Sequence, residues 1–278
     1  MGDRPFISLL SDFGSRDPSA GIMRAVILGL APQANVVDIS HEVAKYRVRD
    51  GGLLLWCAAP YLPVGSHVAV VDPGVGTERR PIALRVHRGD VLIGPDNGLL
   101  LPAAERLGGV VDARLLTSTA HRLPVVSSSF HGRDIFAPAA AHLAIGVPLA
   151  ALGPEIAVAG LVRLRWPLPE VRDGEMVAAV IYVDTFGNVK LGAEAGDLRR
   201  ALGKPNWGAI LRLTRPGQRA VIHATWAETF GRVAAGAALV YEDSYGRLCL
   251  AVNQGDAGAA FGLHEDDRLT IQLEQPGL

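Results

Sequence analysis

A carboxylate and a guanidinium at the two ends of a glycine-rich loop are the first candidates for chemistry. The run 66–71 predicts a strand that ends at Asp72, and the two glycines and one proline that follow predict a sharp, open loop reaching Arg79. In open α/β sheets, ligands bind at the carboxyl ends of the strands. The pair therefore indicates either a ligand site or a tight turn with an exposed salt bridge, which would contribute only about 0–1 kcal/mol.

Other polar residues lie at comparable positions. Asp12, Asp17 and Ser19 follow the first predicted strand, where they could hold a ligand, although Ser19 alone is more typical of a helix N-cap. His131 precedes Gly132 at the expected start of a helix, and a single histidine there is more often a capping or core residue than a catalytic one. Each of these residues is weak evidence for a site by itself. The evidence becomes stronger only if residues from separate segments lie together in the fold.

The elements that must position these residues alternate between strand and helix. Short apolar runs predict strands, and apolar residues at helical spacing between Ile22 and Leu30 predict the first helix. This alternation predicts a largely parallel sheet covered by helices. We expect strands over 6–10, 34–39 and 66–71, helices over 22–30, 48–59, 99–107 and 135–152, and a β-hairpin over 81–93 that turns at Gly89-Asp90.

The composition changes near Leu161, where a proline-rich and then polar stretch begins. We predict an N-terminal α/β domain over 1–164, a linker over 165–175 and a C-terminal domain over 176–278. Short β-like runs separated by turns predict a small β-barrel for the second domain, with a sandwich as the alternative. The runs are 176–183, 209–213, 219–224, 237–241, 248–252 and 268–273.

Composition limits the class of partner. The formal net charge of −1 and the absence of charge runs argue against nucleic acid and anionic membranes, so small molecules or other subunits are expected. Cys57 and Cys249 fit neither a disulfide framework nor a zinc site, which favours the cytoplasm and predicts no metal. The short N-terminal apolar run predicts no secretion signal. Prolines interrupt 135–152, so we expect a buried helix there rather than a membrane span.

Five motifs occur in one order along the chain. Together they resemble the S-adenosyl-L-methionine hydroxide adenosyltransferase family, relatives of the fluorinase and chlorinase enzymes. The resemblance extends from Phe6 to about Leu273. The motifs are Asp12-Phe13-Gly14 with Asp17 and Ser19, Val71–Thr77, Gly94–Gly98, Phe130–Asp134 and Asp184–Asn188.

The resemblance implies an N-terminal α/β domain, a C-terminal β-barrel and a homotrimer in which neighbouring subunits share each substrate site. It also implies roles for individual residues around S-adenosyl-L-methionine. Those matching the surroundings of the attacking water are Asp72, Arg79 and His131. Those matching substrate contacts are Asp12 at the ribose hydroxyls, Asp17, Ser19 and Asp184 at the methionine amino end, Phe186 and Asn188 at the adenine, and Ser244 and Tyr245 near the carboxylate.

The implied reaction is displacement of methionine from the ribose C5′ by water, which gives adenosine and needs no cofactor. The halide-using relatives lack the Asp-Arg-His set and carry an extra loop, whereas only a short hairpin separates Arg79 from Gly94 here. Hydrolysis is therefore favoured. The alternatives are a halogenase of the same fold and a nucleoside-binding or sensing protein with residual hydrolysis. The sequence leaves open whether Asp72 or His131 accepts the water's proton.

Overall fold

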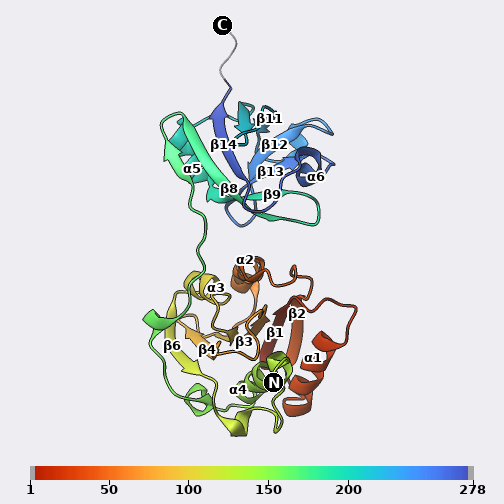
Figure 1. Ribbon diagram of the computed structural model, residues 1–278, viewed down its shortest axis with the longest axis vertical. Helices are drawn as coiled ribbons and strands as arrows, with labels where there is room; N and C mark the ends of the chain where they lie inside the picture. Colours follow the sequence, from red (N-terminus) through yellow and green to blue (C-terminus); the bar gives the residue numbers. More distant parts are fainter. Residues whose placement is uncertain (1–3, 275–278) are drawn as a thin grey trace. The chain divides into compact units, whose positions relative to one another are not determined.

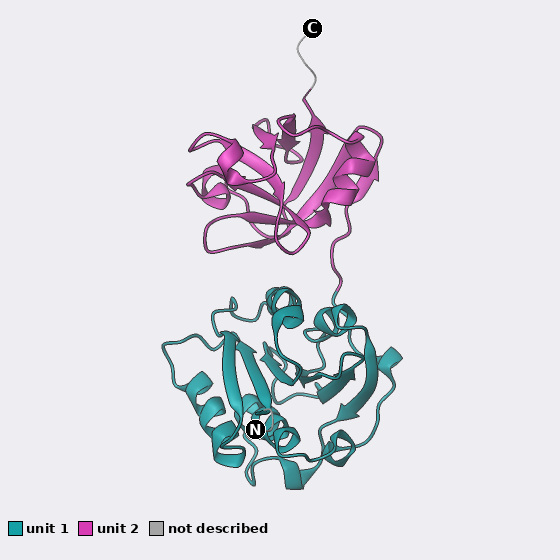
Figure 2. Cartoon of the chain, turned by 180° about the vertical axis from the view of Figure 1, so that it is seen from behind, with its two compact units in different colours: residues 1–164 teal, residues 165–278 magenta. Residues whose placement is uncertain are grey.

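A six-stranded sheet with the order β2-β1-β3-β5-β4-β6 forms the centre of the N-terminal half. The computed structural model describes residues 4–274, so the outer ends of both predicted domains, 1–3 and 275–278, lie outside the described residues. The chain divides into two compact units, residues 1–164 (unit 1) and 165–278 (unit 2), shown in Figure 2. The predicted α/β class with a C-terminal barrel is confirmed, and each unit is described separately below.

The sheet of unit 1 is largely parallel, as predicted. β1 pairs in parallel with β2 and β3, β3 pairs in parallel with β5, and only β4 runs antiparallel to both of its neighbours. The hairpin turning at Gly89-Asp90 is confirmed as β4 and β5. The strands are β1 (Phe6–Ser11), β2 (Asn35–Ser40), β3 (Ser66–Val70), β4 (Pro81–Val86), β5 (Val91–Pro95) and β6 (Val110–Leu115).

Helices cover both faces of this sheet (Figure 1). Alternate residues of β1 point to opposite faces, because side chains alternate along a strand. Ile7 and Leu9 pack with α1 and α4, whereas Leu10 packs with α2 and α3. Two hydrophobic cores therefore hold the sheet in the middle of three layers. The helices are α1 (Ser19–Leu30), α2 (Val48–Ala58), α3 (Leu101–Arg106) and α4 (Ala137–Ala144).

Two local expectations are wrong. Ser19 is the first residue of α1 and does not cap it, because Pro18 takes the N-cap position and no side chain caps the helix. The helix expected over 135–152 is three shorter pieces: a π-helical turn (Gly132–Phe136), α4 and a 3-10 turn (Leu149–Leu152). Gly146, with φ of 91°, and Pro148 end α4, because neither continues an α-helix readily.

Unit 2 is a closed β-barrel. Seven strands follow one another in the order β14-β10-β11-β12-β13-β9-β8, and pairing of β14 with β8 closes the ring. β7, inside the stretch predicted as a linker, pairs with β8. The sequence pattern did not predict β9, α5 or α6. The elements are β7 (Glu170–Arg172), β8 (Glu175–Val183), β9 (Val189–Glu194), α5 (Ala195–Leu202), β10 (Ile210–Thr214), β11 (Val221–Trp226), β12 (Ala238–Glu242), β13 (Arg247–Val252), α6 (Ala257–Phe261) and β14 (Arg268–Leu273).

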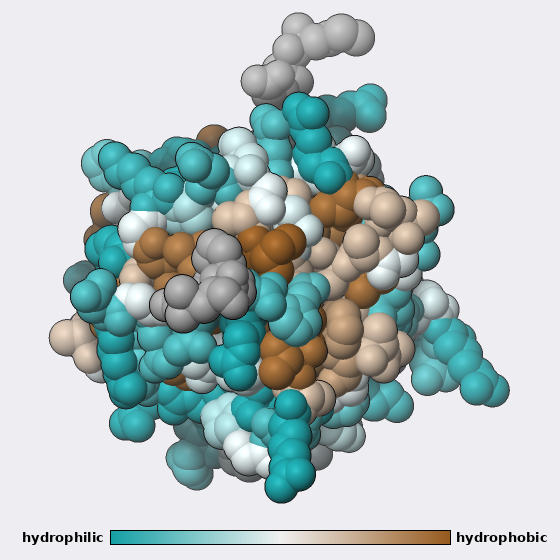
Figure 3. Space-filling model, turned by 90° about the horizontal axis from the view of Figure 1, so that it is seen from above, coloured by the Kyte–Doolittle hydropathy of each residue, from teal (hydrophilic) through white to brown (hydrophobic). Residues whose placement is uncertain are grey.

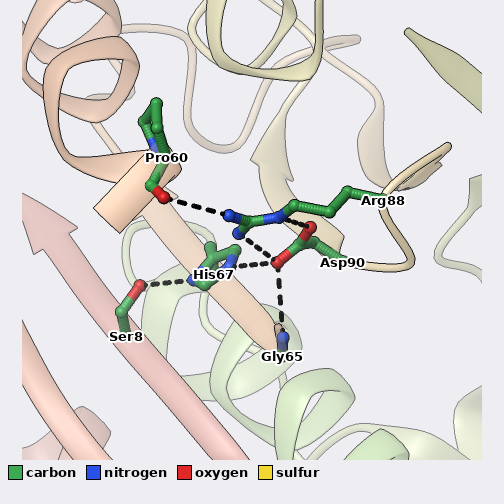
Figure 4. Close-up of polar contacts among 6 residues, drawn as sticks. All are labelled: Ser8, Pro60, Gly65, His67, Arg88 and Asp90. Atoms are coloured by element: carbon green, nitrogen blue, oxygen red, sulfur yellow. Dashed lines mark hydrogen bonds and ion pairs between the residues drawn. The ribbon is translucent and has the colours of Figure 1, made fainter. Parts of the chain in front are cut away.

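A buried polar network links β1, β3 and the β4–β5 turn (Figure 4). Ser8 Oγ lies 2.8 Å from Nδ1 of His67, and Nε2 of His67 lies 2.9 Å from Asp90 Oδ1. Arg88 donates to both oxygens of Asp90 at 2.7 Å, and the neighbouring charges hold the pKa of Asp90 well below its usual range despite its burial. Ser8, His67 and Asp90 are fully buried, so this Ser-His-Asp arrangement is structural and fixes two strands that lead to the site.

None of the helices within residues 4–274 is long and apolar enough to cross a bilayer. On the face shown in Figure 3, apolar side chains form separate patches among hydrophilic ones.

Candidate active site

Arg79 joins Asp72 and His131 into one hydrogen-bonded cluster. Arg79 Nε donates to Asp72 Oδ1 at 3.1 Å, and Nη2 forms a second, shorter contact with Oδ2. The same Nη2 lies 2.9 Å from Nδ1 of His131. Three side chains from two distant segments thus meet at the carboxyl edge of the sheet.

A close backbone approach explains why these segments meet. Gly76 lies in the loop between Asp72 and Arg79 with φ of +77°, and a Cβ on it would stand 2.3 Å from the carbonyl oxygen of Ser128. Only glycine combines that φ with such close contact at no steric cost. The loop is therefore held against the segment that leads directly to His131.

The Asp72–Arg79 pair is not the exposed salt bridge that the sequence left open. The side chains are only 5% and 7% exposed, and the Arg79 guanidinium lies over the Phe136 ring, 5.5 Å from its centroid. Arg79 Nη1 is buried and has no hydrogen-bond partner among residues 4–274. Burial, followed by the charge of Arg79, lowers the pKa of His131. The cluster thus combines a paired carboxylate with an imidazole whose lowered pKa favours the neutral form.

A cavity of about 250 Å³ opens beside this cluster. It contains Asp12, whose Oδ2 accepts a hydrogen bond from the backbone N–H of Tyr46 at 2.9 Å. Lys45 and Tyr46 could not be predicted from the sequence, because no local pattern in residues 41–46 indicates that this loop contacts Asp12. The lining residues are Asp12, Phe13, Lys45, Tyr46, Val70, Asp72, Val75, Ser129, Phe130, His131 and Gly132.

The other two predicted residues of unit 1 do not line this cavity. Asp17 is exposed in the loop before α1, and Ser19 is half-buried at the start of that helix. Their assignment to the methionine amino end stays a prediction.

In unit 2, the predicted residues Asp184, Phe186 and Asn188 form one turn between β8 and β9. Asp184 Oδ1 accepts from the backbone N–H groups of Phe186 and Asn188 at 2.9 Å, and Oδ2 accepts from Asn188 Nδ2 at the same distance. The Phe186 side chain is presented to solvent, with the residue 77% exposed. Asp184 thus shapes the turn that presents the aromatic ring.

This turn borders a mainly apolar hollow of about 680 Å³ in unit 2. Phe186 and Phe230 both line it, so two aromatic rings are available there for contact with a flat ligand. Phe230 was missed because one phenylalanine in a turn-rich stretch carries no sequence signal. The lining residues are Phe186, Asn188, Phe230, Val252, Gln254, Gly255 and Asp256.

Ser244 and Tyr245 lie in the turn between β12 and β13, and neither lines that hollow. The backbone N–H of Tyr245 donates to Asp243 Oδ1 at 2.9 Å. The centroid of the Tyr245 ring lies 5.2 Å from Lys190 Nζ. Their assignment to the substrate carboxylate stays a prediction. Within the part of the chain that the structure describes, no group of three or more His, Cys, Asp or Glu residues is placed to hold a metal ion.

The fold and cluster define a protein with an α/β unit, a β-barrel unit and a polar site at the sheet's carboxyl edge. Family models described as the N-terminal and C-terminal domains of SAM hydroxide adenosyltransferase match residues 7–153 and 178–270. The chain belongs to this family.

Relatives cover nearly the whole chain. The "(R)-S-adenosyl-L-methionine hydrolase" of Salinispora tropica is 46% identical over 98% of this chain and 99% of its own length. A fluorinase of Nocardia brasiliensis is 30% identical over 94% of this chain and 95% of its own length. A crystal structure of an uncharacterized conserved protein from Thermotoga maritima has a TM-score of 0.88, is 34% identical, and covers 96% of this chain and 99% of that one.

Proposed function

We propose that this protein hydrolyses S-adenosyl-L-methionine to adenosine and L-methionine by attack of water at the ribose C5′. The observation that carries the proposal is the hydrogen-bonded Asp72–Arg79–His131 cluster beside a cavity that also contains Asp12. Asp12 uses Oδ2 for Tyr46, so Oδ1 is the oxygen that we assign to a ribose hydroxyl. The hydrolase name of the full-length relative supports the same reaction.

We assign Asp72 as the proton acceptor, and the hydrogen bond between Arg79 and His131 supports this choice. A guanidinium has only N–H donors, so Nδ1 of His131 must be the acceptor of the bond from Arg79. A neutral His131 then carries its proton on Nε2 and can only donate from that atom. Each oxygen of the Asp72 carboxylate retains a further lone pair beyond its bond to Arg79. Asp72 accepts the water's proton, and His131 donates to the water oxygen and orients it.

The electron flow needs no acid at the leaving group. A lone pair of water forms the C5′–O bond while the C5′–S bond breaks, and its electrons pass to sulfur, so methionine departs as a neutral thioether. As the new bond forms, the attacking water becomes strongly acidic, so the Asp72 carboxylate can take its proton. Orientation of the water in line with the C5′–S bond supplies much of the remaining acceleration.

The sulfonium of the substrate is a stereocentre, and the relative from Salinispora tropica is named for the (R) form. We assign the same epimer to this chain. The two epimers differ in the direction of the methyl group when the adenosyl and methionine parts are held. A site that anchors both parts therefore accepts one methyl position better than the other.

The assembly that we propose is a homotrimer in the cytoplasm, with each substrate held by two subunits. The cavity of about 250 Å³ in unit 1 is smaller than most pockets for drug-sized ligands, which measure about 300–1,000 Å³. It suits the ribose and the water rather than the whole substrate. In unit 2, Phe186 and Phe230 line the hollow of about 680 Å³. These two rings support the proposal that the β-barrel binds the adenine and that Phe186 contacts it.

The pH profile tests the neutral state of His131. Because burial and Arg79 lower the pKa of His131, kcat/KM should persist below the ordinary histidine pKa of about 6.5 and fall only in more acidic solution. Protonation of Nδ1 would remove the acceptor for Arg79 and place two cations together. The measurement is kcat/KM across the acidic range, and a fall centred above about pH 6.5 would contradict the assignment.

The experiment that tests the function is chromatography of the products from each sulfonium epimer, with and without chloride or fluoride. We expect adenosine and methionine, formed faster from the (R) epimer and independently of halide. A 5′-halo-adenosine product would instead identify a halogenase. Turnover too slow for metabolism, with tightly retained adenosine, would identify a nucleoside-binding protein.

A further inference from the structure

A second histidine lies at the same edge of the sheet as the proposed active site. β1 and β2 run in parallel, with Leu10 opposite Ser40, so the residues that follow them, Ser11 and His41, are neighbours. Ser11 Oγ lies 2.7 Å from Nδ1 of His41. The other ring nitrogen, Nε2, lies 3.3 Å from Asp38 Oδ1. The imidazole is thus held between the ends of two strands.

Asp38 also pairs with a residue on the surface of the protein. It pairs with Arg24 of α1, so the chain of contacts runs from a helix on the surface to the end of β1. The His41 side chain is only 9% exposed, whereas that of Asp38 is 36% exposed. Ser11 is buried and does not line the cavity, so this Ser-His-Asp arrangement offers no nucleophile to a ligand.

Backbone contacts connect this group to the cavity. The N–H of Gly14 donates to the carbonyl of His41 at 2.7 Å, and the N–H of Phe13 donates to Ser11 Oγ at 3.3 Å. The N–H of Val43 donates to the carbonyl of Ser11 at 3.3 Å. The segments 11–14 and 41–46 are therefore joined by contacts made at Ser11 and His41.

These two segments supply part of the cavity wall. Asp12 and Phe13 come from the first, and Lys45 and Tyr46 from the second. Tyr46 has φ of +65°, a conformation that costs a bulky residue free energy and persists only where neighbouring contacts enforce it. Its N–H holds Asp12 Oδ2. Asp12 and Tyr46 thus lie on the two segments that the contact between Ser11 and His41 helps to join.

We propose that His41 is a positioning residue that fixes Asp12 and the 41–46 segment for binding of the adenosine part of the substrate. The inference rests on the proposed hydrolase function and adds a residue that does not touch substrate. Loss of the imidazole should make the position of Asp12 and of its partner Tyr46 less fixed. The Asp72–Arg79–His131 cluster should stay intact. The expected signature is therefore weaker binding with little change in the chemical step.

The test compares His41→Ala with His41→Asn, whose side-chain amide can occupy the place of Nδ1 beside Ser11. His41→Ala should raise KM about tenfold, the size expected for one lost buried hydrogen bond, and leave kcat within about threefold. His41→Asn should restore KM to within about threefold of the wild-type value. Calorimetric Kd values for adenosine should follow KM. The control is His87→Ala, an exposed histidine in the hairpin turn, which should change neither value.

Ser11→Ala provides the same test from the other partner and alters only one buried oxygen. Because Ser11 Oγ also accepts from the N–H of Phe13, Ser11→Ala should raise KM at least as much as His41→Ala does. The double variant should show no increase beyond that of Ser11→Ala, because the two residues share one interaction. Unchanged KM and Kd in both single variants, or an asparagine variant as impaired as the alanine variant, would overturn the proposal. Wild-type protein that binds adenosine without turnover would refute the hydrolase function, while the Kd series would still test His41.

Discussion

Asp72→Asn is expected to lower kcat by about 10²–10⁴-fold, the usual contribution of a positioned general base. The amide keeps the shape of the carboxylate but cannot take the water's proton. KM should change little, because Asp72 faces the attacking water and Asp12 holds the ribose in this mechanism. Initial rates of adenosine formation at several substrate concentrations give both constants.

The matched variant for Asp72→Asn is His131→Gln, whose amide N–H can replace the Nε2 donor. If Asp72 is the acceptor and His131 the donor, His131→Gln should retain more activity than His131→Ala, whereas no neutral residue should restore activity at position 72. Near-normal turnover by Asp72→Asn would refute the assignment of the base. Equal loss in the two His131 variants would refute the donor role.

Asp90→Ala is expected to destabilise unit 1 by about 3–5 kcal/mol, because it leaves a buried polar network without its anion. Arg88 would lose its carboxylate and keep only the carbonyl of Pro60, and the Nε2 atom of His67 and the backbone N–H of Gly65 would lose their contacts with Asp90 Oδ1. Urea unfolding followed by circular dichroism measures the change. A cost this large would reduce the yield of folded protein without any change at the active site.

Glu105→Gln supplies the control for Asp90→Ala. Glu105 pairs with Arg163, and both side chains are 60% exposed, so the loss should stay below about 1 kcal/mol. Equal destabilisation by Asp90→Ala and Glu105→Gln would show that burial of the network contributes nothing.

The buried network of the wild-type protein should also weaken in acid. The pKa of Asp90 is lowered on folding, so its contribution to stability is present above the ordinary aspartate pKa and is lost as pH falls.

Most of the architecture of unit 1 was predictable because its elements carry strong local signals, whereas the edge strand β6 was not predicted. β1 and β3 are short apolar runs bounded by turn residues, and the apolar spacing of α1 is helical. The hairpin was predictable from Gly89-Asp90 between two apolar runs. The first residues of α1 and α4 were not predictable. Pro18 is the N-cap of α1 and offers no side-chain cap, and a π-helical turn directly precedes α4.

The site was only partly predictable. The spacing of Asp72 and Arg79 indicates that they can pair, but only the folded structure shows that His131 joins them through Arg79. The sequence left open which residue accepts the proton, and the hydrogen bond from Arg79 to His131 is the basis of our proposal that it is Asp72. Tyr46 and His41 were not found because their roles depend on the parallel pairing of β1 with β2. Long-range contacts of this kind leave no local pattern.

The most direct test of water attack at C5′ is hydrolysis of S-adenosylmethionine in ¹⁸O-labelled water, with mass spectrometry of the products. We expect one labelled oxygen in adenosine, located at the 5′-hydroxyl, and unlabelled methionine. Adenosine without label, or label found in the methionine product instead, would contradict attack of water at C5′.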